Sequence, residues 1–484
     1  MAHNQYELLK QRRFLPFFLT QALGAFNDNV FRNAMLALMV YQMGLSTAQA
    51  TLYSNLAPAL FILPYFLFSA TAGQIAERYE KAKLIRFTTA LEIGIMSLAA
   101  FGFIYGSPWL LLFCLFLTGV QSTLFGPVKY AILPQVLAPE EMTGGNGLVE
   151  MGTSISILIG MIVGMSLLMI PGYGPQAAAT AMIALAITGH LVSRAIPVAP
   201  AIAPHLKINP NMFAESIHVL RMVRSNNVVR RAVFGVSWFW FVGTMLSAQL
   251  PNYAKIHLGG SESLNLLALA LFSIGTGLGS LWCEKLSNRT IEIGLVPFGA
   301  LGMTIFCADL YFARPGLAPE TGISLMYFLQ QAGSYRIMAD LALIGLFTGF
   351  FIVPLFALIQ SRTNKQELSR VIAGMNIQNA AFICTAAVIG IVLQRYFAIS
   401  IPQLFLLLAM MNAAVAIYLM VLVPEFLMRF LAWIYIRMMY RVGVHGVEKH
   451  VPDDGPALLV CNHVSYMDAS ILSSAIPRPI RFVM

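Results

Sequence analysis

Polar and charged side chains interrupt the first long apolar segment of the chain, residues 14–41. The hydrocarbon core of a bilayer is about 30 Å thick and is crossed by about 20 helical residues, so Asn27, Asp28 and Asn29 are expected near its centre. Arg32 follows Asp28 by four residues, a spacing at which helical side chains meet. A carboxylate at that depth costs about 2.5–3.5 kcal/mol and usually faces a protein interior or an aqueous cavity. We interpret Asp28, Asn29 and Arg32 as a site for a charged ligand; an ion pair that only lets the helix insert is the alternative.

A second group of reactive side chains lies near the end of the chain, where an apolar run from Ala457 leads into Asn462, His463 and then Asp468. A buried strand, the pattern Asn-His-x-x-x-x-Asp and a following helical pattern resemble the first block of the glycerophospholipid acyltransferases. The resemblance implies that His463 is the general base on a lysolipid hydroxyl and that Asp468 orients and charge-stabilises the imidazole. The alternative is a chance His and Asp at a turn.

Membrane helices are the elements that must position the first group. Hydrophobic residues make up 58% of the 484 residues and only 11% are charged, a balance that soluble domains do not show. The N-terminal apolar run is too long for a signal peptide and lacks a cleavage site, so it is the first span. The five cysteines have no metal-type spacing, and the basic residues behind the net charge of +9 are not interleaved with aromatics. The sequence therefore predicts a polytopic membrane protein and indicates no metal, cofactor or nucleic-acid partner.

Twelve spans are expected, with boundaries near 14–42, 51–76, 84–106, 108–133, 147–170, 175–198, 231–256, 263–286, 291–313, 336–361, 371–396 and 401–424. Lys and Arg concentrate in loops of one parity, and such loops stay in the cytoplasm. Both termini are therefore predicted to be cytoplasmic.

The longest interior connection, residues 199–230, contains prolines and an amphipathic stretch from Met212 to Val223. It divides the spans into a half at 1–198 and a half at 231–424. A weak internal repeat supports the division, and its members are the segments 127–135 and 354–360 with Asn146 and Asn376 after them. Repeated halves of this kind place a binding site at their interface and move by rocking.

The loop after the second span reads Gly73-Gln-Ile-Ala-Glu77-Arg78-Tyr-Glu-Lys81-Ala-Lys83. This resembles the loop signature of the major facilitator superfamily, with Glu77 in place of the commoner aspartate. The resemblance implies that Gly73, Glu77 and Arg78 act in gating by clasping the ends of neighbouring spans. The corresponding stretch of the second half, 279–286, is degenerate. The alternative, that the loop is only an ordinary basic flank of a membrane span, would explain its lysines but not the glycine together with the Glu-Arg pair.

Longer stretches over residues 10–424 are more specific: LGAFNDNVFRNA, FGPVKYAILPQ, GNGLVEMGT, VPLFALIQ and RVIAGMNIQNA. Together they resemble the bacterial lysophospholipid transporter branch of that superfamily. The resemblance implies an all-α major facilitator fold in the bacterial inner membrane. It also implies movement of lysophosphatidylethanolamine and related lipids from the outer to the inner leaflet. A drug or nutrient carrier of the same superfamily is the alternative.

Further ionisable residues at membrane depth suit a zwitterionic head group. Lys129 or Arg32 would bind its phosphate, and Asp28 or Glu150 its ammonium group; a structural Lys129–Glu150 ion pair is the alternative. The aromatic cluster at 238–241 either lines the acyl chain or, more simply, packs in the helix bundle. His190 is expected to be a hydrogen-bonded interior histidine.

After the last span the chain changes character. Residues 425–441 form an expected interfacial amphipathic helix with Arg429, Arg437 and Arg441 on one face. Residues 442–484, which include a short strand-like pair at 443–447, are too few for a packed α/β catalytic domain. We expect a fragment of a longer fusion of transporter, acyltransferase and an acyl-activating domain, whose partners are lysophospholipid and membrane lipids. Whether the chain is an enzyme stays open, and an acyltransferase with a membrane anchor is a further alternative.

Overall fold

The computed structural model describes residues 5–287, 291–313, 323–422, 424–443, 451, 457–476 and 480. These residues are almost entirely helical, and the predicted all-α membrane fold is confirmed. Eleven helices within the described ranges are long and apolar enough to cross a membrane. The first predicted span contains α1 (Leu15–Ala37), whose 23 residues include the polar group around Asp28; that α1 crosses the membrane remains a prediction.

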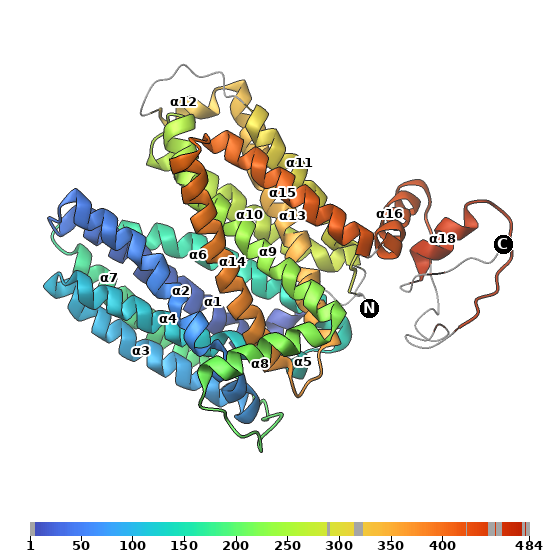
Figure 1. The fold of residues 1–484 in the computed structure, drawn as a ribbon, viewed down its shortest axis with the longest axis horizontal. Coiled ribbons are helices and arrows are strands. Elements are labelled where there is room, and N and C mark those ends of the chain that lie inside the picture. The colour runs from blue at the N-terminus through green and yellow to red at the C-terminus, as the bar shows by residue number, and fades with distance from the viewer. Residues whose placement is uncertain are drawn as a thin grey trace.

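Helices α1 to α7 form one group, which we call the N-terminal half (Figure 1). After a short 3-10 helix at Gln5–Lys10 and α1, this half continues with α2 (Thr47–Arg78), α3 (Lys81–Tyr105), α4 (Pro108–Ala131), α5 (Leu133–Val136), α6 (Met142–Leu168) and α7 (Gly174–Ser193). Two clusters of buried apolar side chains form its core.

Helices after residue 226 form the C-terminal half, on the other side of the molecule in Figure 1. Its members are α9 (Asn227–Asn252), α10 (Glu262–Ser287), α11 (Leu295–Phe312), α12 (Leu325–Leu329), α13 (Ala332–Arg362), α14 (Leu368–Tyr396) and α15 (Ile401–Leu422). One large cluster of buried side chains runs through them. The amphipathic helix expected at Met212 is α8 (Met212–Ser225), which packs on α2 and α14. The exact boundaries 1–198, 199–230 and 231–424 stay predictions.

The two halves meet closely at the end that carries the N-terminal 3-10 helix and the α2–α3 loop. Gly73 of α2 faces Ala373 of α14 so closely that an added Cβ would lie 2.7 Å from the alanine side chain. In the same way, Gly147 of α6 lies against the Ser280 backbone carbonyl of α10. Glycine is required at both positions because any side chain would push the helices apart. We call this contact zone the seam.

The segment after α15 continues as α16 (Pro424–Met439) and α18 (Asp468–Ala475). A helix was expected at 425–441, and α16 covers most of this range, although the side chains of Arg429 and Arg437 lie outside the described residues. The strand-like pair expected at 443–447 also lies outside them, except for residue 443. The buried strand expected from Ala457 is wrong: residues 457–465 have no regular secondary structure, and Leu458 and Val460 are each 88% exposed. Within the described residues nothing pairs with this segment or covers its apolar side chains, and a strand needs both.

Candidate functional site

Asp28 and Arg32 share a face of α1, yet they do not form an ion pair with each other. The Asp28 carboxylate accepts a hydrogen bond from the Ser122 hydroxyl of α4 at 3.2 Å. Arg32 donates to the Asn29 side-chain oxygen at 2.5 Å. Both charged residues are half-buried, whereas Asn29 is buried. The guanidinium group has five N–H donors, so most of them stay available to a ligand.

Lys129 and Glu150 show the same arrangement closer to the seam. We call the membrane depth of each pair of charges, Asp28 with Arg32 and Lys129 with Glu150, a level. The Lys129 ammonium group donates to the Thr153 hydroxyl at 3.0 Å, and the Glu150 carboxylate accepts from the Tyr130 hydroxyl at 2.8 Å. Among the described residues neither charge has an ion-pair partner within 4.0 Å. The direct Lys129–Glu150 ion pair considered from the sequence is therefore absent.

The two levels are connected through antiparallel α1 and α4. Thr153 donates to Gln21, which precedes Asp28 by seven residues, and Lys129 follows Ser122 by seven residues. Seven helical residues span about 10 Å. Each level thus contains one cation and one carboxylate, held by neutral neighbours.

This polar face of α4 is turned towards the C-terminal half. An added Cβ on Gly126, one turn from Ser122, would lie 2.9 Å from the Asn376 side chain of α14. One turn further, the Tyr130 ring stacks on Phe356 of α13 with centroids 4.2 Å apart. The two levels therefore lie at the interface of the halves, just inside the seam.

Glu92 and Asn27 make a separate buried contact between α3 and α1, in which Asn27 donates to Glu92 at 2.7 Å. His190 lies near Thr89, with its Nδ1 3.1 Å from the threonine hydroxyl. The aromatic cluster is mostly internal: the Trp238 ring stacks on Phe241 and its Nε1–H donates to Asn412 at 2.8 Å. These contacts favour structural roles for all three features.

At the seam, Glu77 forms an ion pair between the two halves. Its fully buried carboxylate accepts from the Arg370 Nε–H at 2.6 Å and from the Arg370 backbone N–H at 3.1 Å. Arg78, by contrast, lies over the ring of its neighbour Tyr79. Arg370 lies 293 positions from Glu77, and nothing in the sequence identifies the two residues as partners.

Two further side-chain contacts close the seam. Asn146 of α6 donates to the Gln360 side-chain oxygen at 2.6 Å, and Gln360 donates to the Tyr130 backbone carbonyl at 3.1 Å. Both Asn146 and Gln360 belong to the internal repeat. The second-half stretch that seemed degenerate provides Glu284, which accepts from the Gln5 backbone N–H at 3.2 Å. The repeat therefore marks residues that cross between the halves.

His463 and Asp468 lie together at the start of α18. The Asp468 Oδ2 is 3.2 Å from the His463 Nδ1 and accepts from the Ser465 and Val464 backbone N–H groups at 2.8 and 2.6 Å. The Ser465 and Val464 N–H groups hold the pKa of the Asp468 carboxyl below its usual range. The His463 side chain is 77% exposed. The carboxylate can thus orient the imidazole, as the acyltransferase resemblance implies.

The helical bundle and its seam define a transporter of the major facilitator type. Residues 17–377 match the sequence model of the Major Facilitator Superfamily, and the chain belongs to this family. Residues 441–484 match the Acyltransferase family. The fold is similar to that of the human organic anion transporter MFSD10 (TM-score 0.67, 12% identity, covering 84% of this chain and 99% of that one). It is also similar to the proton:xylose symporter XylE (TM-score 0.62, 12% identity, 88% and 97%).

Curated relatives carry a more specific name. The chain is 26% identical over 379 residues to the lysophospholipid transporter LplT of Serratia proteamaculans, covering 78% of this chain and 87% of the relative. It is 28% identical over 357 residues to LplT of Citrobacter koseri, covering 71% and 79%. The resemblance noted in the sequence is thereby confirmed for both parts of the chain.

Proposed function

We propose that this chain transports lysophospholipids across the bacterial inner membrane, from the outer to the inner leaflet, and delivers them for reacylation. The name of its curated relatives supports the substrate class. The observation that carries the proposal is the pair of membrane-depth levels in which a cation and a carboxylate stay available instead of neutralising each other.

The level of Asp28 and Arg32 fits a zwitterionic head group. The phosphate and the ammonium group of lysophosphatidylethanolamine are separated by two carbon atoms, and two side chains one helical turn apart are about 5–6 Å apart at their Cβ atoms. Arg32 binds the phosphate through its planar fork of donors, and Asp28 binds the ammonium group. Asn29 positions Arg32 by accepting one of its N–H groups.

The level of Lys129 and Glu150 is the second position of the head group. It lies closer to the seam and repeats the same pair of charges about 10 Å away. Lys129 is the more available of the two, because Glu150 is 8% exposed and accepts from Tyr130. Opening of the seam lets a head group held here continue towards the opposite side of the membrane.

The orientation in this proposal rests on the distribution of Lys and Arg, which favours a cytoplasmic seam end. The seam is closed by Glu77, Arg370, Asn146 and Gln360, so the bound levels are reached from the other side. Alternating access then requires these contacts to break while others form. We propose Gly73, Glu77 and Arg78 as gating residues, with Glu77 making an ion pair that crosses between the halves.

Residues 441–484 support the link to reacylation, because an acyltransferase uses a lysolipid as its acceptor. In this proposal His463 takes the proton of the acceptor hydroxyl, and Asp468, 3.2 Å from its Nδ1, orients the imidazole. A lysolipid that has reached the cytoplasmic leaflet would be available to this segment on the same membrane face.

The test is transport by the purified chain in proteoliposomes. Labelled lysophosphatidylethanolamine is added outside, and the fraction that albumin can no longer extract measures movement to the inner leaflet. We expect movement above protein-free vesicles, with no competition from a sugar or a cationic drug. Arg32→Gln and Lys129→Gln should each reduce it, whereas Lys255→Gln, at an exposed lysine of the C-terminal half, should not. Competition by the sugar or the drug would favour a nutrient or drug carrier, and equal rates in all variants would refute the proposed site.

A further inference from the structure

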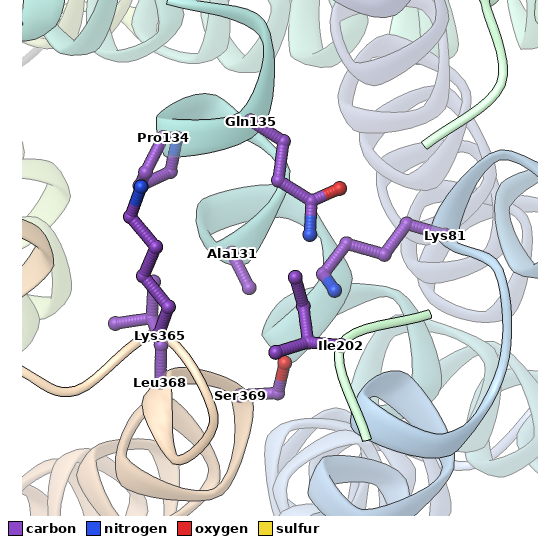
Figure 2. Close-up of a pocket in the computed structure, with 8 residues that line it drawn as sticks. All are labelled: Lys81, Ala131, Pro134, Gln135, Ile202, Lys365, Leu368 and Ser369. Atoms are coloured by element: carbon purple, nitrogen blue, oxygen red, sulfur yellow. The ribbon is translucent and has the colours of Figure 1, made fainter. Parts of the chain in front are cut away.

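A small pocket lies beside the seam, outside the two charged levels (Figure 2). It is partly open to solvent. The N-terminal half contributes Lys81, Ala131, Pro134 and Gln135, the C-terminal half contributes Lys365, Leu368 and Ser369, and Ile202 comes from the connection between them. Both halves are needed to form it.

Lys81 is the unusual residue of this pocket. It is 1% exposed, and its ammonium nitrogen has no hydrogen-bond partner among the described residues. Figure 2 shows its side chain directed into the pocket, with the Ser369 hydroxyl across from it and the Gln135 side chain beside it. A buried ammonium group without a partner is costly, and the N–H donors of Lys81 stay available to an occupant of the pocket.

The surrounding groups favour a negatively charged occupant. Lys365 at the rim is exposed and adds a second positive charge. The 29-residue helix α14 begins at Leu368, so its N-terminal backbone N–H groups and the positive end of its dipole lie at the pocket. The buried carboxylate of Glu77, four residues before Lys81, already accepts two hydrogen bonds from Arg370.

We propose that this pocket binds a phosphate group, and that the bound phosphate holds the two halves together at the seam. Lys81 and Lys365 supply the charge, and Ser369 and the start of α14 supply neutral donors. Because residues from both halves line the pocket, the site is complete only while the seam is closed. A ligand that binds one state alone shifts the equilibrium towards it.

The proposal does not depend on the identity of the transported molecule, so it is tested by binding. The purified chain in detergent is titrated with inorganic phosphate at constant ionic strength, with chloride as the reference salt, and the melting temperature is followed. We expect a saturable rise. Lys81→Gln should raise the phosphate concentration at half-saturation about tenfold or more, because a charge-assisted hydrogen bond is lost. Lys83→Gln, at an exposed lysine two residues away, should leave it unchanged.

Two additional arms keep the result interpretable. Lys81→Arg should retain most of the phosphate response. This would show that the loss of the response in Lys81→Gln does not come from misfolding. Nanodiscs of zwitterionic lipid with and without phosphatidic acid distinguish the sources: stabilisation by phosphatidic acid that depends on Lys81 identifies a lipid head group, and dependence on soluble phosphate alone identifies the free ion. An equal response in Lys81→Gln and the unaltered chain, or no saturable response in either arm, would overturn the proposal.

Discussion

Replacing Glu77 by glutamine should shift the chain away from the state in which the seam is closed. The carboxylate is fully buried and accepts two hydrogen bonds from Arg370 of the other half. The glutamine side chain would keep the shape but lose the charge, and leave the guanidinium group of Arg370 without its counter-ion.

The size of the effect follows from the burial of the two partners. Removing one partner of a buried pair costs about 3–5 kcal/mol, and an exposed pair is worth about 0–1 kcal/mol. Since the Arg370 side chain keeps 15% exposure, we expect about 2 kcal/mol. If the contact exists only while the seam is closed, this changes the ratio of closed to open molecules about 30-fold.

Pulsed electron spin resonance can measure this ratio. Spin labels at Lys83 and Gln366, two exposed residues that flank the seam, report the distance between the halves. We expect a short distance to dominate in the parent chain and a longer one to gain population in Glu77→Gln. Glu7→Gln is the matched control, because its ion pair with Lys10 is exposed and lies within one helix.

A double-mutant cycle with Arg370→Gln separates this contact from general loosening. The double variant should be less perturbed than the sum of the single variants. An unchanged distance distribution in Glu77→Gln, or fully additive effects, would show that the ion pair does not stabilise the closed seam.

Three other outcomes are expected. Asp28→Asn and Lys129→Ala should each lower lysophosphatidylethanolamine movement about tenfold while the melting temperature changes little; full transport in both would remove the head-group assignment. Trp238→Phe should lower stability by about 1 kcal/mol, since Asn412 loses its indole donor, with transport retained; loss of transport at unchanged stability would instead favour an acyl-chain wall. The pKa of the Asp468 carboxyl is lowered in the folded chain, so its hydrogen bonds to the backbone should persist at any pH above the unfolded carboxyl pKa of about 3.9. Hydrogen-exchange protection around Ser465 should therefore be complete above that pH and disappear as the pH falls through the lower folded pKa. Protection lost already at neutral pH would contradict this geometry.

The fold class could be predicted because it depends on local composition. Long apolar runs specify membrane helices one at a time, and the amphipathic pattern from Met212 specifies α8 without reference to the rest of the chain. The same local logic failed at Leu458 and Val460, where a strand-like apolar run is exposed. A strand is defined by its neighbour, and a helix is not.

The candidate site could be predicted only as far as residue types allow. Asp28 and Lys129 are identified by the cost of charge in a bilayer, which needs no knowledge of neighbours. Their actual partners, Ser122 and Thr153, are ordinary hydroxyl residues on other helices and carry no signal in the sequence. The same holds for Arg370, whose role depends on how the halves pack.

Another pair of charged residues in this chain, Asp309 and Arg336, shows how a structural ion pair differs from the proposed binding site. Near the end of α11, both oxygens of Asp309 accept from two nitrogens of Arg336, which is how a guanidinium and a carboxylate neutralise each other. Arg32 and Asp28, one turn apart on the same helix, have the opportunity for such a contact and instead bind neutral partners. If their task were only to let α1 insert, the pairing seen at Arg336 would be the lower-energy solution. Their separation supports the proposed ligand with two charges of its own, which would complete both contacts at once.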